Sequence, residues 1–390
     1  MPPRRVLILT FYYPPDLCAG SFRAGAFVDA LQAREDPNLV IDVLTTMPNR
    51  YQSYRSTASP IEEHGNLNIY RFQLNNHKSG FLDQSLCFFE YGRQVLNHVA
   101  SKEYDVVFAT SSRLMTASLG AYVSKRKRVP LYLDIRDIFT DTMSDVLGTP
   151  MRITALPFFR FLERYTMRSA SIINLVSKGF KEHFRAFSDE QQLRFFTNGI
   201  DPEFLNQDFF QQQDSSDRKS ILVAGNIGEG QGLHKIIPEV ADLIKERFDL
   251  IVVGDGGTKD RLVEACLGKD NVKLLPPVGR GELMAFYSSA DVLFMHLNDH
   301  DAFRKVLPSK IFEYAATGKP VLAGVAGYAA AFTEREVENA AVFPPCDADA
   351  MAASLDTLDL SMCDREEFKS KYAREAIMAK MTDDLLSVFT

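Results

Sequence analysis

The sequence has few of the features that mark secreted, metal-binding or membrane-spanning proteins. Its five cysteines are scattered and form no CxxC pair, a pattern typical of reduced, unpaired thiols in the cytosol. Its seven histidines show neither an HExxH motif nor paired ligand spacing, so we predict no structural metal. No apolar run approaches the length of about eighteen residues that a membrane span requires. The apolar run that starts at Val6 is too short for a signal peptide, so we predict a first buried strand there.

Two further absences exclude classes of function. A formal net charge of −7 argues against a nucleic-acid-binding protein. The dinucleotide fingerprint GxGxxG is missing after the first predicted strand, because the first glycine there is Gly20 and the loop contains two prolines. A nicotinamide or flavin cofactor is therefore disfavoured, and we predict that the protein uses no cofactor.

What the sequence does contain is a repeated alternation of strands and helices. Its 390 residues, 46% of them apolar and 24% charged, are typical of a soluble protein with two domains. The polar, unpatterned residues 206–219 are predicted to be a linker. We expect an α/β fold with one Rossmann-like domain over 1–205, a second over 220–368, and a C-terminal helix over 369–390 that packs back toward the first domain.

Two glycine-rich turns stand at strand-to-helix junctions in the second half. The turn 225–232 follows a strand predicted over 220–224, and the turn 254–257 follows one predicted over 249–254. Backbone N–H groups at such turns bind phosphate, so the pair indicates a phosphate site. The alternative is that these glycines only serve tight turns.

The stretch 307–327 combines a predicted helix with two unexplained charges. The helix is predicted to start at Ser309, as its N-cap, and to end before Gly318, ahead of a buried strand over 321–323. Lys310 lies in the first turn, where a cation opposes the helix dipole but suits a bound anion. Glu313 lies one turn further on and suits sugar hydroxyls, because a carboxylate accepts two hydrogen bonds. The alternative is an ordinary surface lysine and glutamate.

The first half carries its candidate residues near the ends of predicted strands. Gly20 would let the backbone approach a ligand, and Arg23 would meet a phosphate unless it is only a solvated helix residue. Arg136 and Asp137 follow the strand that ends at Asp134, at the mouth of the predicted sheet. Their alternative role is an ion pair that only fixes the loop.

Two basic segments suggest contact with a membrane surface. Residues 122–128 include a basic run at a predicted helix end, and the predicted helix over 151–168 combines phenylalanines with arginines. Apolar and basic helices of this kind lie on anionic lipid surfaces. A solvated helix end and a core-packed helix with an exposed basic side explain the same patterns.

Seven stretches of the chain also occur, in this order, in a known family. They are Tyr13-Pro-Pro with Gly20-Ser and Arg23, Asp134-Ile-Arg-Asp, Asn198-Gly-Ile-Asp, Gly225-Asn-Ile-Gly, Gly254-Asp-Gly, Ser289-Ala-Asp-Val and Pro308-Ser-Lys-Ile-Phe-Glu with the residues to Pro320. The set resembles the family-4 glycosyltransferases, which have the GT-B fold. Among them it is most similar to bacterial enzymes of surface-polysaccharide assembly, including the N-acetylfucosamine-type transferases. The resemblance implies two Rossmann-like domains with parallel sheets that face an interdomain cleft.

The resemblance also implies roles for individual residues. Glu313 matches the glutamate that holds the nucleotide ribose, while Lys310 and the loop 225–228 would hold the diphosphate. The implied catalytic residues are Arg136, Asp137 and Lys310. The implied donor-binding residues are Gly225, Asn226, Ile227, Gly228, Gly254, Gly256, Phe303, Ser309, Lys310 and Glu313. The implied acceptor or phosphate side comprises Gly20, Ser21, Arg23, Ser111 and Asn198.

The implied activity is transfer of a sugar from an NDP-sugar, with a UDP-sugar favoured, to a glycan or polyprenol-linked acceptor. From the family we expect retention of anomeric configuration without a metal, with the leaving diphosphate helping to deprotonate the acceptor. We expect a cytoplasmic protein, peripheral on the inner face of the membrane, that acts in surface-polysaccharide biosynthesis.

Two positions depart from the family pattern and keep alternatives open. Lys305 stands where the family has the first glutamate of a spaced pair, and Arg136 stands where it often has a histidine. One alternative is a nucleotide-sugar 2-epimerase of similar fold, although we find no converging set of acid and base groups. The other is a nucleotide-sugar-binding protein without catalysis. The sequence does not identify the base, the sugar, the acceptor, the linkage or the oligomeric state.

Overall fold

In the computed structural model, the chain divides into two compact units. Unit 1 comprises Met1–Asn198 and Glu375–Thr390, and unit 2 comprises Gly199–Arg374. The structure describes residues 3–49, 57–74, 81–111, 114–141, 149–209 and 218–389. The boundary falls at Gly199 rather than after residue 205, because Ile200 and Phe204 are buried in a core of unit 2. Of the predicted linker, residues 210–217 lie outside the described part of the chain.

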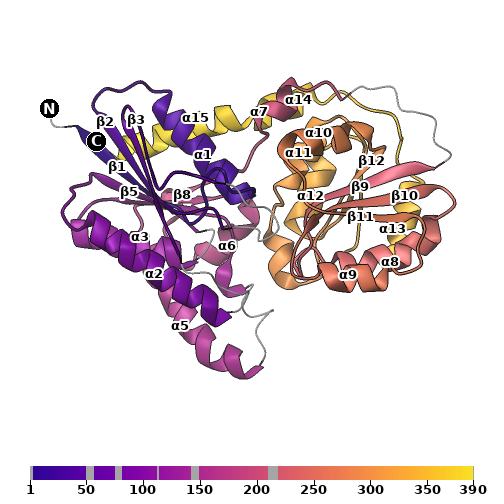
Figure 1. Cartoon of the computed structure of the whole chain (residues 1–390), viewed down its shortest axis with the longest axis horizontal. Coiled ribbons are helices and arrows are strands. Elements are labelled where there is room, and N and C mark those ends of the chain that lie inside the picture. Colours follow the sequence, from indigo (N-terminus) through magenta and orange to yellow (C-terminus); the bar gives the residue numbers. More distant parts are fainter. Residues whose placement is uncertain are drawn as a thin grey trace. The chain divides into compact units, whose positions relative to one another are not determined.

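Unit 1 is built on a sheet of eight strands in the order β3-β4-β2-β1-β5-β6-β7-β8 (Figure 1). Only β3 runs antiparallel to its neighbour among these strands. The strands are β1 (Arg4–Leu9), β2 (Leu39–Thr46), β3 (Ile61–His64), β4 (Leu67–Phe72), β5 (Val106–Thr110), β6 (Leu131–Ile135), β7 (Ile172–Leu175) and β8 (Leu193–Arg194). All residues of β5, β6 and β7 are buried, as expected for parallel strands that are covered on both faces.

Helices cover both faces of this sheet. They are α1 (Ala19–Gln32), α2 (Phe81–Val99), α3 (Leu114–Lys127), α5 (Thr149–Arg168), α6 (Lys181–Phe184) and α15 (Arg374–Leu386). Helices α1 and α15 pack on one face, in a single core with β1 and β2. Helices α2 and α3 cover the opposite face, and α5 packs against α3 (Figure 1).

The C-terminal segment is two helices, whereas the sequence predicted one C-terminal helix over 369–390. α14 (Glu366–Tyr372) stops at Ala373, which has an extended ψ of 122°. There the backbone pairs with Ile200, whose N–H donates to Tyr372 O (2.7 Å) and whose carbonyl accepts from the Arg374 N–H (2.9 Å). These two hydrogen bonds to Ile200 replace two bonds that a continuous helix would make.

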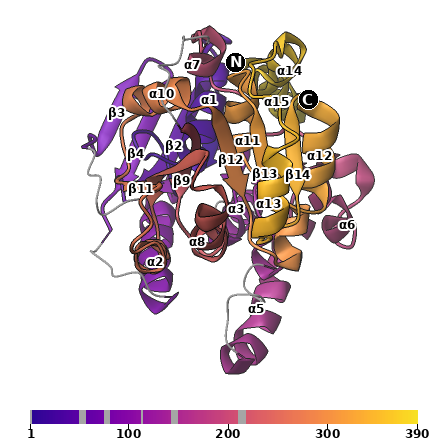
Figure 2. The same cartoon turned by 90° about the vertical axis from the view of Figure 1, so that its right-hand side faces the viewer.

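Unit 2 contains a sheet of six parallel strands in the order β11-β10-β9-β12-β13-β14. The strands are β9 (Lys219–Asn226), β10 (Phe248–Asp255), β11 (Val272–Leu275), β12 (Val292–His296), β13 (Val321–Gly324) and β14 (Ala340–Phe343). Figure 2, in which unit 2 faces the viewer, shows β11, β9, β12, β13 and β14 following one another across the sheet.

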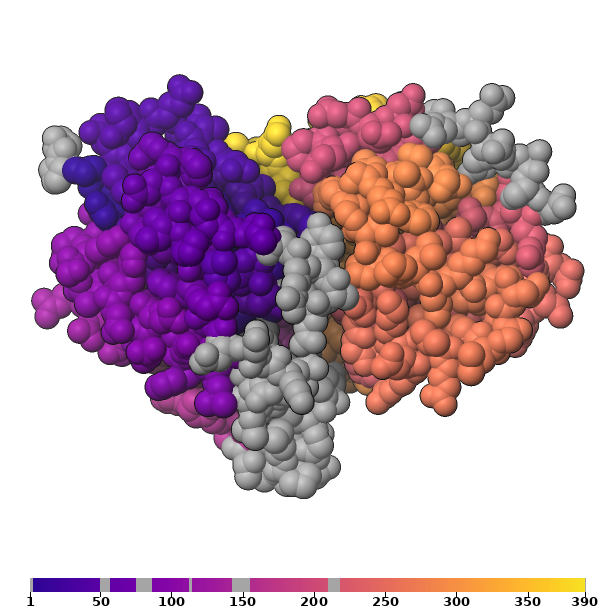
Figure 3. Space-filling model, in the orientation of Figure 1, coloured from indigo at the N-terminus to yellow at the C-terminus, as the bar shows by residue number. Residues whose placement is uncertain are grey.

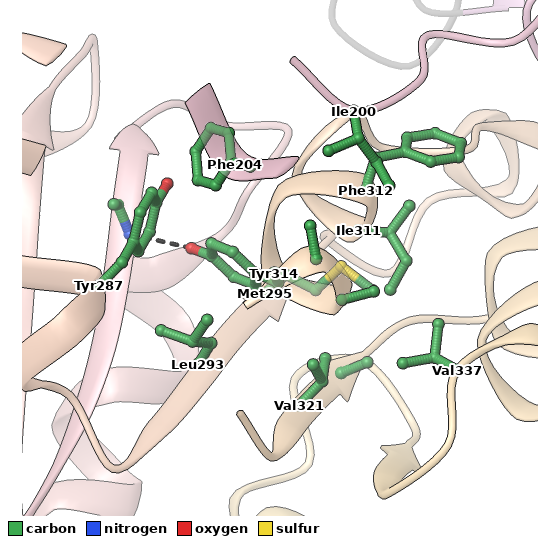
Figure 4. Close-up of a cluster of buried hydrophobic side chains, with 14 of the residues drawn as sticks. Ile200, Phe204, Tyr287, Leu293, Met295, Ile311, Phe312, Tyr314, Val321 and Val337 are labelled. Atoms are coloured by element: carbon green, nitrogen blue, oxygen red, sulfur yellow. Dashed lines mark hydrogen bonds between the residues drawn. The ribbon is translucent and has the colours of Figure 1, made fainter. Parts of the chain in front are cut away.

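Two apolar cores fill the faces of the unit 2 sheet. One lies under α7 (Pro202–Asn206), α10 (Arg280–Ser289), α11 (Lys310–Ala316), α12 (Tyr328–Glu336) and α14, and Figure 4 shows part of it. The other lies under α8 (Leu233–Ile244), α9 (Lys259–Ala265) and α13 (Ala348–Leu355). Across the described residues of both units, every helix is too short or too polar to span a bilayer.

Candidate functional site

The two predicted glycine turns of unit 2 lie side by side at the carboxyl ends of β9 and β10. Gly254 is paired with Gly225 in the register of these strands. A Cβ atom on Gly254 would overlap the carbonyl oxygen of Gly225, and one on Gly256 would overlap that of Ile227. The turns are joined by the Ile227 N–H, which donates to Asp255 O (2.9 Å). Glycine is therefore required here for close backbone approach, and the approach brings two glycine-rich turns to one place.

Lys310, Glu313 and Tyr287 form a compact polar triangle next to these turns. The Lys310 Nζ lies 2.7 Å from Glu313 Oε2 and 3.0 Å from the Tyr287 hydroxyl, which in turn lies 3.1 Å from Glu313 Oε2. A Cβ on Gly225 would come within 3.3 Å of Lys310 Cε, so the lysine side chain lies over the first glycine turn. Lys310 and Glu313, predicted as separate ligands of phosphate and ribose, are thus also partners of each other.

The electrostatics of the triangle keep both charges. Burial alone would raise the pKa of Glu313, but Lys310 and then Arg280 hold it below its usual value. Burial alone would lower the pKa of Lys310, but the Glu313 carboxylate raises it overall. Glu313 is only 5% exposed, and its hydrogen bonds with Tyr287 and Lys310 both go to Oε2. The site therefore presents a lysine cation and a carboxylate at neutral pH.

Helix α11 is fixed in place by its apolar side and by Tyr314. Ile311, Phe312 and Ala315 are buried in the unit 2 core, as the sequence predicted for one face of this helix. The Tyr314 hydroxyl accepts the Ala224 N–H (3.1 Å), a bond drawn as a dashed line in Figure 4. Ser309 is the N-cap residue but its side chain makes no capping bond. With only seven residues, α11 is too short for its N-terminus alone to form an anion site.

A second polar cluster supports the triangle from behind. Asp201 forms ion pairs with Arg280 and with Arg374, and the guanidinium of Arg280 also lies 3.7 Å from Glu203. Arg280 begins α10, the helix that carries Tyr287. This cluster ties α10 to the chain segment that enters unit 2 at Gly199, and the positive charges of Arg280 and Arg374 contribute to lowering the pKa of Glu313.

Two side chains, one at the end of β12 and one just after it, hold the first glycine turn from the other side. His296 Nε2 accepts the Cys346 N–H (2.9 Å), so its protonated Nδ1 donates to the carbonyl of Gln231. Asn298 Oδ1 accepts a hydrogen bond from Lys235 Nζ (2.9 Å), and Asn298 Nδ2 donates to Glu229 O (2.8 Å). The conformation of the turn is therefore stabilised by hydrogen bonds from His296 and Asn298 as well as by its glycines.

Phe303, predicted to contact the donor, packs on the same turn. It lies in the short 3-10 helix η3 (Asp301–Lys305), and a Cβ on Gly230 would meet its ring at 3.1 Å. The half-buried ring thus covers Gly230, and Lys305 ends the same element. Of the other predicted donor residues, Asn226 donates to Gln231 Oε1 (2.7 Å), a bond that lies within the turn.

The predicted residues of unit 1 gather at the carboxyl ends of its strands. The Arg136 N–H donates to Ser111 Oγ (2.9 Å), and the Ser111 N–H donates to Asp134 O (2.9 Å). Arg136 Nη1 is buried without a hydrogen-bond partner among the described residues, and Asp137 is exposed. Gly20 and Ser21 are buried in the first turn of α1, and Asn198 is buried at the end of unit 1. Ser112 and Arg113, the next residues of the hydroxyl-rich turn that contains Ser111, lie outside the described residues.

Arg23 has a structural role in place of the predicted contact with phosphate. Its guanidinium makes a bidentate ion pair with Asp134, with Nε at 2.8 Å and Nη2 at 2.9 Å from the carboxylate oxygens. It also donates to the carbonyls of Phe196 and Thr197, and it is 1% exposed. Asn174 completes the network by donating to Asp134 Oδ1 (2.7 Å). An arginine with its donors engaged in this way is not available to a ligand.

Sequence reasoning missed Tyr287, Arg280, His296 and Asn298. Tyr287 lies 23 residues before Lys310 on a different helix, and an isolated tyrosine carries no motif. Asp201 belonged to a motif, Asn198-Gly-Ile-Asp, but its partners Arg280 and Arg374 are far away in sequence. Only the fold brings these side chains together.

Part of the chain matches a family of known proteins. Residues 206–375 match the family described as glycosyl transferases group 1. Over 103 residues the chain is 34% identical to the putative colanic acid biosynthesis glycosyl transferase WcaI of Escherichia coli K12. That match covers 26% of this chain and only a quarter of the relative's length. The predicted family is thus confirmed for this part, while the finer likeness to N-acetylfucosamine-type transferases stays a prediction.

Solved structures share the fold over nearly the whole chain. HepE from Anabaena, in complex with UDP, superposes with a TM-score of 0.63 at 16% identity and covers 98% of this chain and all of its own. WaaG, a glycosyltransferase involved in lipopolysaccharide biosynthesis, superposes with a TM-score of 0.60 at 14% identity, covering 97% of this chain and 95% of its own. At such low identities the likeness shows the fold alone, and it confirms the predicted GT-B type. The sheet of unit 2 is parallel as predicted, and that of unit 1 is parallel except for β3.

Proposed function

We propose that this chain, whose residues 206–375 belong to the glycosyl transferases group 1, transfers a sugar from an NDP-sugar to a glycan or polyprenol-linked acceptor. The observation that carries the proposal is the Lys310–Glu313 pair beside the two apposed glycine turns. Backbone N–H groups and a lysine suit a diphosphate, and a fixed carboxylate suits the two hydroxyls of a ribose. A nucleoside diphosphate has these two parts at adjacent positions.

Within this proposal UDP is the favoured nucleotide. Support comes from HepE, a protein of the same fold whose structure contains UDP. The proposed role is in surface-polysaccharide assembly on the cytoplasmic face of the membrane. The polysaccharide part of this role is supported by the descriptions of WcaI and WaaG, which refer to colanic acid and lipopolysaccharide.

The proposed reaction retains the anomeric configuration and needs no metal. The bond between the anomeric carbon and the diphosphate breaks, the acceptor oxygen bonds to the same face of that carbon, and the acceptor proton passes to a diphosphate oxygen. Lys310 stabilises the charge that develops on the diphosphate. Arg136 and Asp137 of unit 1 are proposed to contact the sugar or the acceptor, since the buried Arg136 Nη1 has no partner within the described part of the chain and a ligand oxygen would supply one.

The test compares Lys310→Ala and Glu313→Gln with a matched pair of control variants. Lys369 and Glu366 on α14 also form a 2.7 Å ion pair within one helical turn of unit 2, but away from the glycine turns. Lys310→Ala and Glu313→Gln should each weaken UDP binding by about 10- to 100-fold, since a hydrogen bond to a charged group contributes about 1.5–3 kcal/mol. Lys369→Ala and Glu366→Gln should leave it unchanged, as measured by calorimetric titration with UDP.

Assays with UDP-sugars then distinguish the classes of activity. Transfer or donor hydrolysis that is lost in the Lys310 and Glu313 variants supports the proposal. Conversion of the donor to its 2-epimer would instead identify an epimerase. Tight binding without turnover across an acceptor panel would identify a nucleotide-sugar-binding protein, the outcome that Lys305 and Arg136 keep open.

A further inference from the structure

The outer surface of unit 1 carries large apolar side chains that are open to solvent. Leu86 and Phe89 of α2 are 68% and 72% exposed, and Tyr122 of α3 is 46% exposed. Phe158 and Phe161 of α5 are 56% and 67% exposed. A single exposed apolar residue needs no explanation, but several on neighbouring elements indicate a binding surface.

The three helices that carry these residues are neighbours. Helix α3 packs against α2 on one side and against α5 on the other. Ser118 of α3 and Thr166 of α5 share a hydrogen bond of 2.9 Å, and Lys125 Nζ lies 4.2 Å from the centre of the Tyr165 ring. Figure 1 shows these helices on the same side of the unit 1 sheet. In Figure 3 the violet atoms, the colour of the sequence range that includes α2 and α3, cover part of the face of unit 1 in view.

The opposite sides of these helices are buried, so the exposed residues point away from the sheet. On α2 the rings of Phe88 and Tyr91 pack against Phe11, and the Tyr91 hydroxyl donates to Leu44 O (2.8 Å). On α5, Phe159 is buried. We call the exposed residues the α2–α3–α5 surface: Leu86, Phe89, Arg93, Tyr122, Lys125, Arg126, Phe158, Arg160, Phe161, Arg164 and Arg168.

The charged members of the α2–α3–α5 surface are all basic. They are Arg93, Lys125, Arg126, Arg160, Arg164 and Arg168. Within the described side chains of these three helices no acid is exposed, because Glu90 is half-buried and Glu163 is buried in bonds to Thr140 and His183. The chain as a whole has a net charge of −7, so this positive surface runs against the composition. Its sign therefore complements an anionic partner.

We propose that the α2–α3–α5 surface docks unit 1 on the surface of a membrane that contains anionic lipids. Exposed phenylalanines insert at the boundary between headgroups and acyl chains, while arginines reach the phosphates with their apolar stems against the lipid. A nucleic acid would use the charges but leave the apolar side chains in water, so the combination favours lipid. The proposal covers the predicted segments 122–128 and 155–168 and adds α2, while the side chains of 151–154 lie outside the described residues.

Vesicle flotation of the full chain tests this surface. The protein should float with vesicles of phosphatidylcholine and phosphatidylglycerol, and not with phosphatidylcholine alone. Since each basic residue near an anionic bilayer strengthens binding about fivefold, the triple variant Arg160→Gln, Arg164→Gln, Arg168→Gln should bind about a hundredfold more weakly. The triple variant Phe89→Ser, Phe158→Ser, Phe161→Ser should also lose binding. Leu267→Ser, at a unit 2 position that is 73% exposed, is the matched control and should bind as wild type does.

Three results would overturn the proposal. They are equal binding to vesicles with and without anionic lipid, wild-type binding by both triple variants, and a wild-type dimer in sedimentation velocity that the serine variant abolishes. The last would assign the surface to a second copy of the chain. UDP titration of each variant in solution keeps this test separate from sugar transfer, because UDP binding through unit 2 should persist in all of them.

Discussion

Glu313 Oε2 accepts hydrogen bonds from both Lys310 and Tyr287, and these bonds fix how the carboxylate is turned. A buried ion pair offsets its desolvation only when its remaining polar groups are also satisfied, and the tyrosine hydroxyl meets part of that requirement. With Oε2 occupied, Oε1 is the oxygen left for a ligand. Tyr287 is therefore a positioning residue, which acts through Glu313 rather than by touching the nucleotide.

Removal of the Tyr287 hydroxyl should weaken recognition of the ribose more than that of the diphosphate, because Lys310 loses its hydrogen bond to Tyr287 but keeps the one to Glu313. In Tyr287→Phe the UDP affinity should fall about fivefold, the effect of one hydrogen bond of about 1 kcal/mol. The measurement is calorimetric titration with UDP and with its 2′,3′-dideoxy analogue. Since the analogue lacks the hydroxyls, its affinity should fall less than that of UDP. Equal losses for both ligands would show that Tyr287 has only a structural role.

Side-chain chemistry visible in the sequence predicted part of this site. Lys310 and Glu313 were identified because charges at these helix positions are not needed for packing. Tyr287 was not, since its role depends on α10 lying beside α11, a contact between residues distant in sequence. Arg23 was misassigned for the same reason: its partners Asp134, Phe196 and Thr197 come from other parts of the chain.

At the scale of elements, the glycine turn after β9 is held from both sides. Gly254 and Gly256, at and after the end of β10, approach it on one side. His296, the last residue of β12, and Asn298, two residues later, bond to it on the other side. Turns of this kind were predicted from glycine spacing alone, because only glycine permits the approach. The hydrogen bonds from His296 and Asn298, which we call the clamp, were not predictable from the sequence. A histidine at the end of a buried strand equally suits a core position.

The clamp should make the stability of unit 2 depend on pH. Burial lowers the pKa of His296 to about 4, from an ordinary value of 6.5. As pH falls from 6.5 toward 4 the unfolded chain takes up a proton that the folded chain excludes, so stability falls by about 1.4 kcal/mol per pH unit. Urea unfolding at pH 7 and pH 5 should show this loss in wild type and a smaller one in His296→Gln, which does not titrate. Identical losses in both proteins would contradict the role given to His296.

At the scale of the whole molecule, the chain leaves unit 2 at Arg374 and ends in a helix that belongs to unit 1. Met378, Met381 and Leu385 of α15 are fully buried in the core that contains β1 and α1. Asp384 also pairs with Arg194 (2.7 Å) and accepts the Tyr132 hydroxyl (3.0 Å). The alternation of strands and helices predicted two domains, but the break at Ala373 depends on pairing with Ile200 and has no local signal.

Methionines in the two cores should report on the two units separately. Met381 in unit 1 and Met351 in unit 2 are both fully buried. Replacement of either by alanine should cost about 2–5 kcal/mol of unfolding free energy in its own unit. Amide hydrogen exchange should show reduced protection of β1 in Met381→Ala and of β9 in Met351→Ala. Reduced protection of both strands in each variant would mean that the two units unfold as one.

The central claim is that a nucleoside diphosphate is held in unit 2 by the glycine turns, Lys310 and Glu313. A crystal structure of the protein with UDP tests it most directly. The account predicts the diphosphate on the backbone N–H groups of residues 225–228 and on Lys310 Nζ, with the ribose hydroxyls on the Glu313 carboxylate. A diphosphate bound elsewhere, or a ribose that does not touch Glu313, would contradict it.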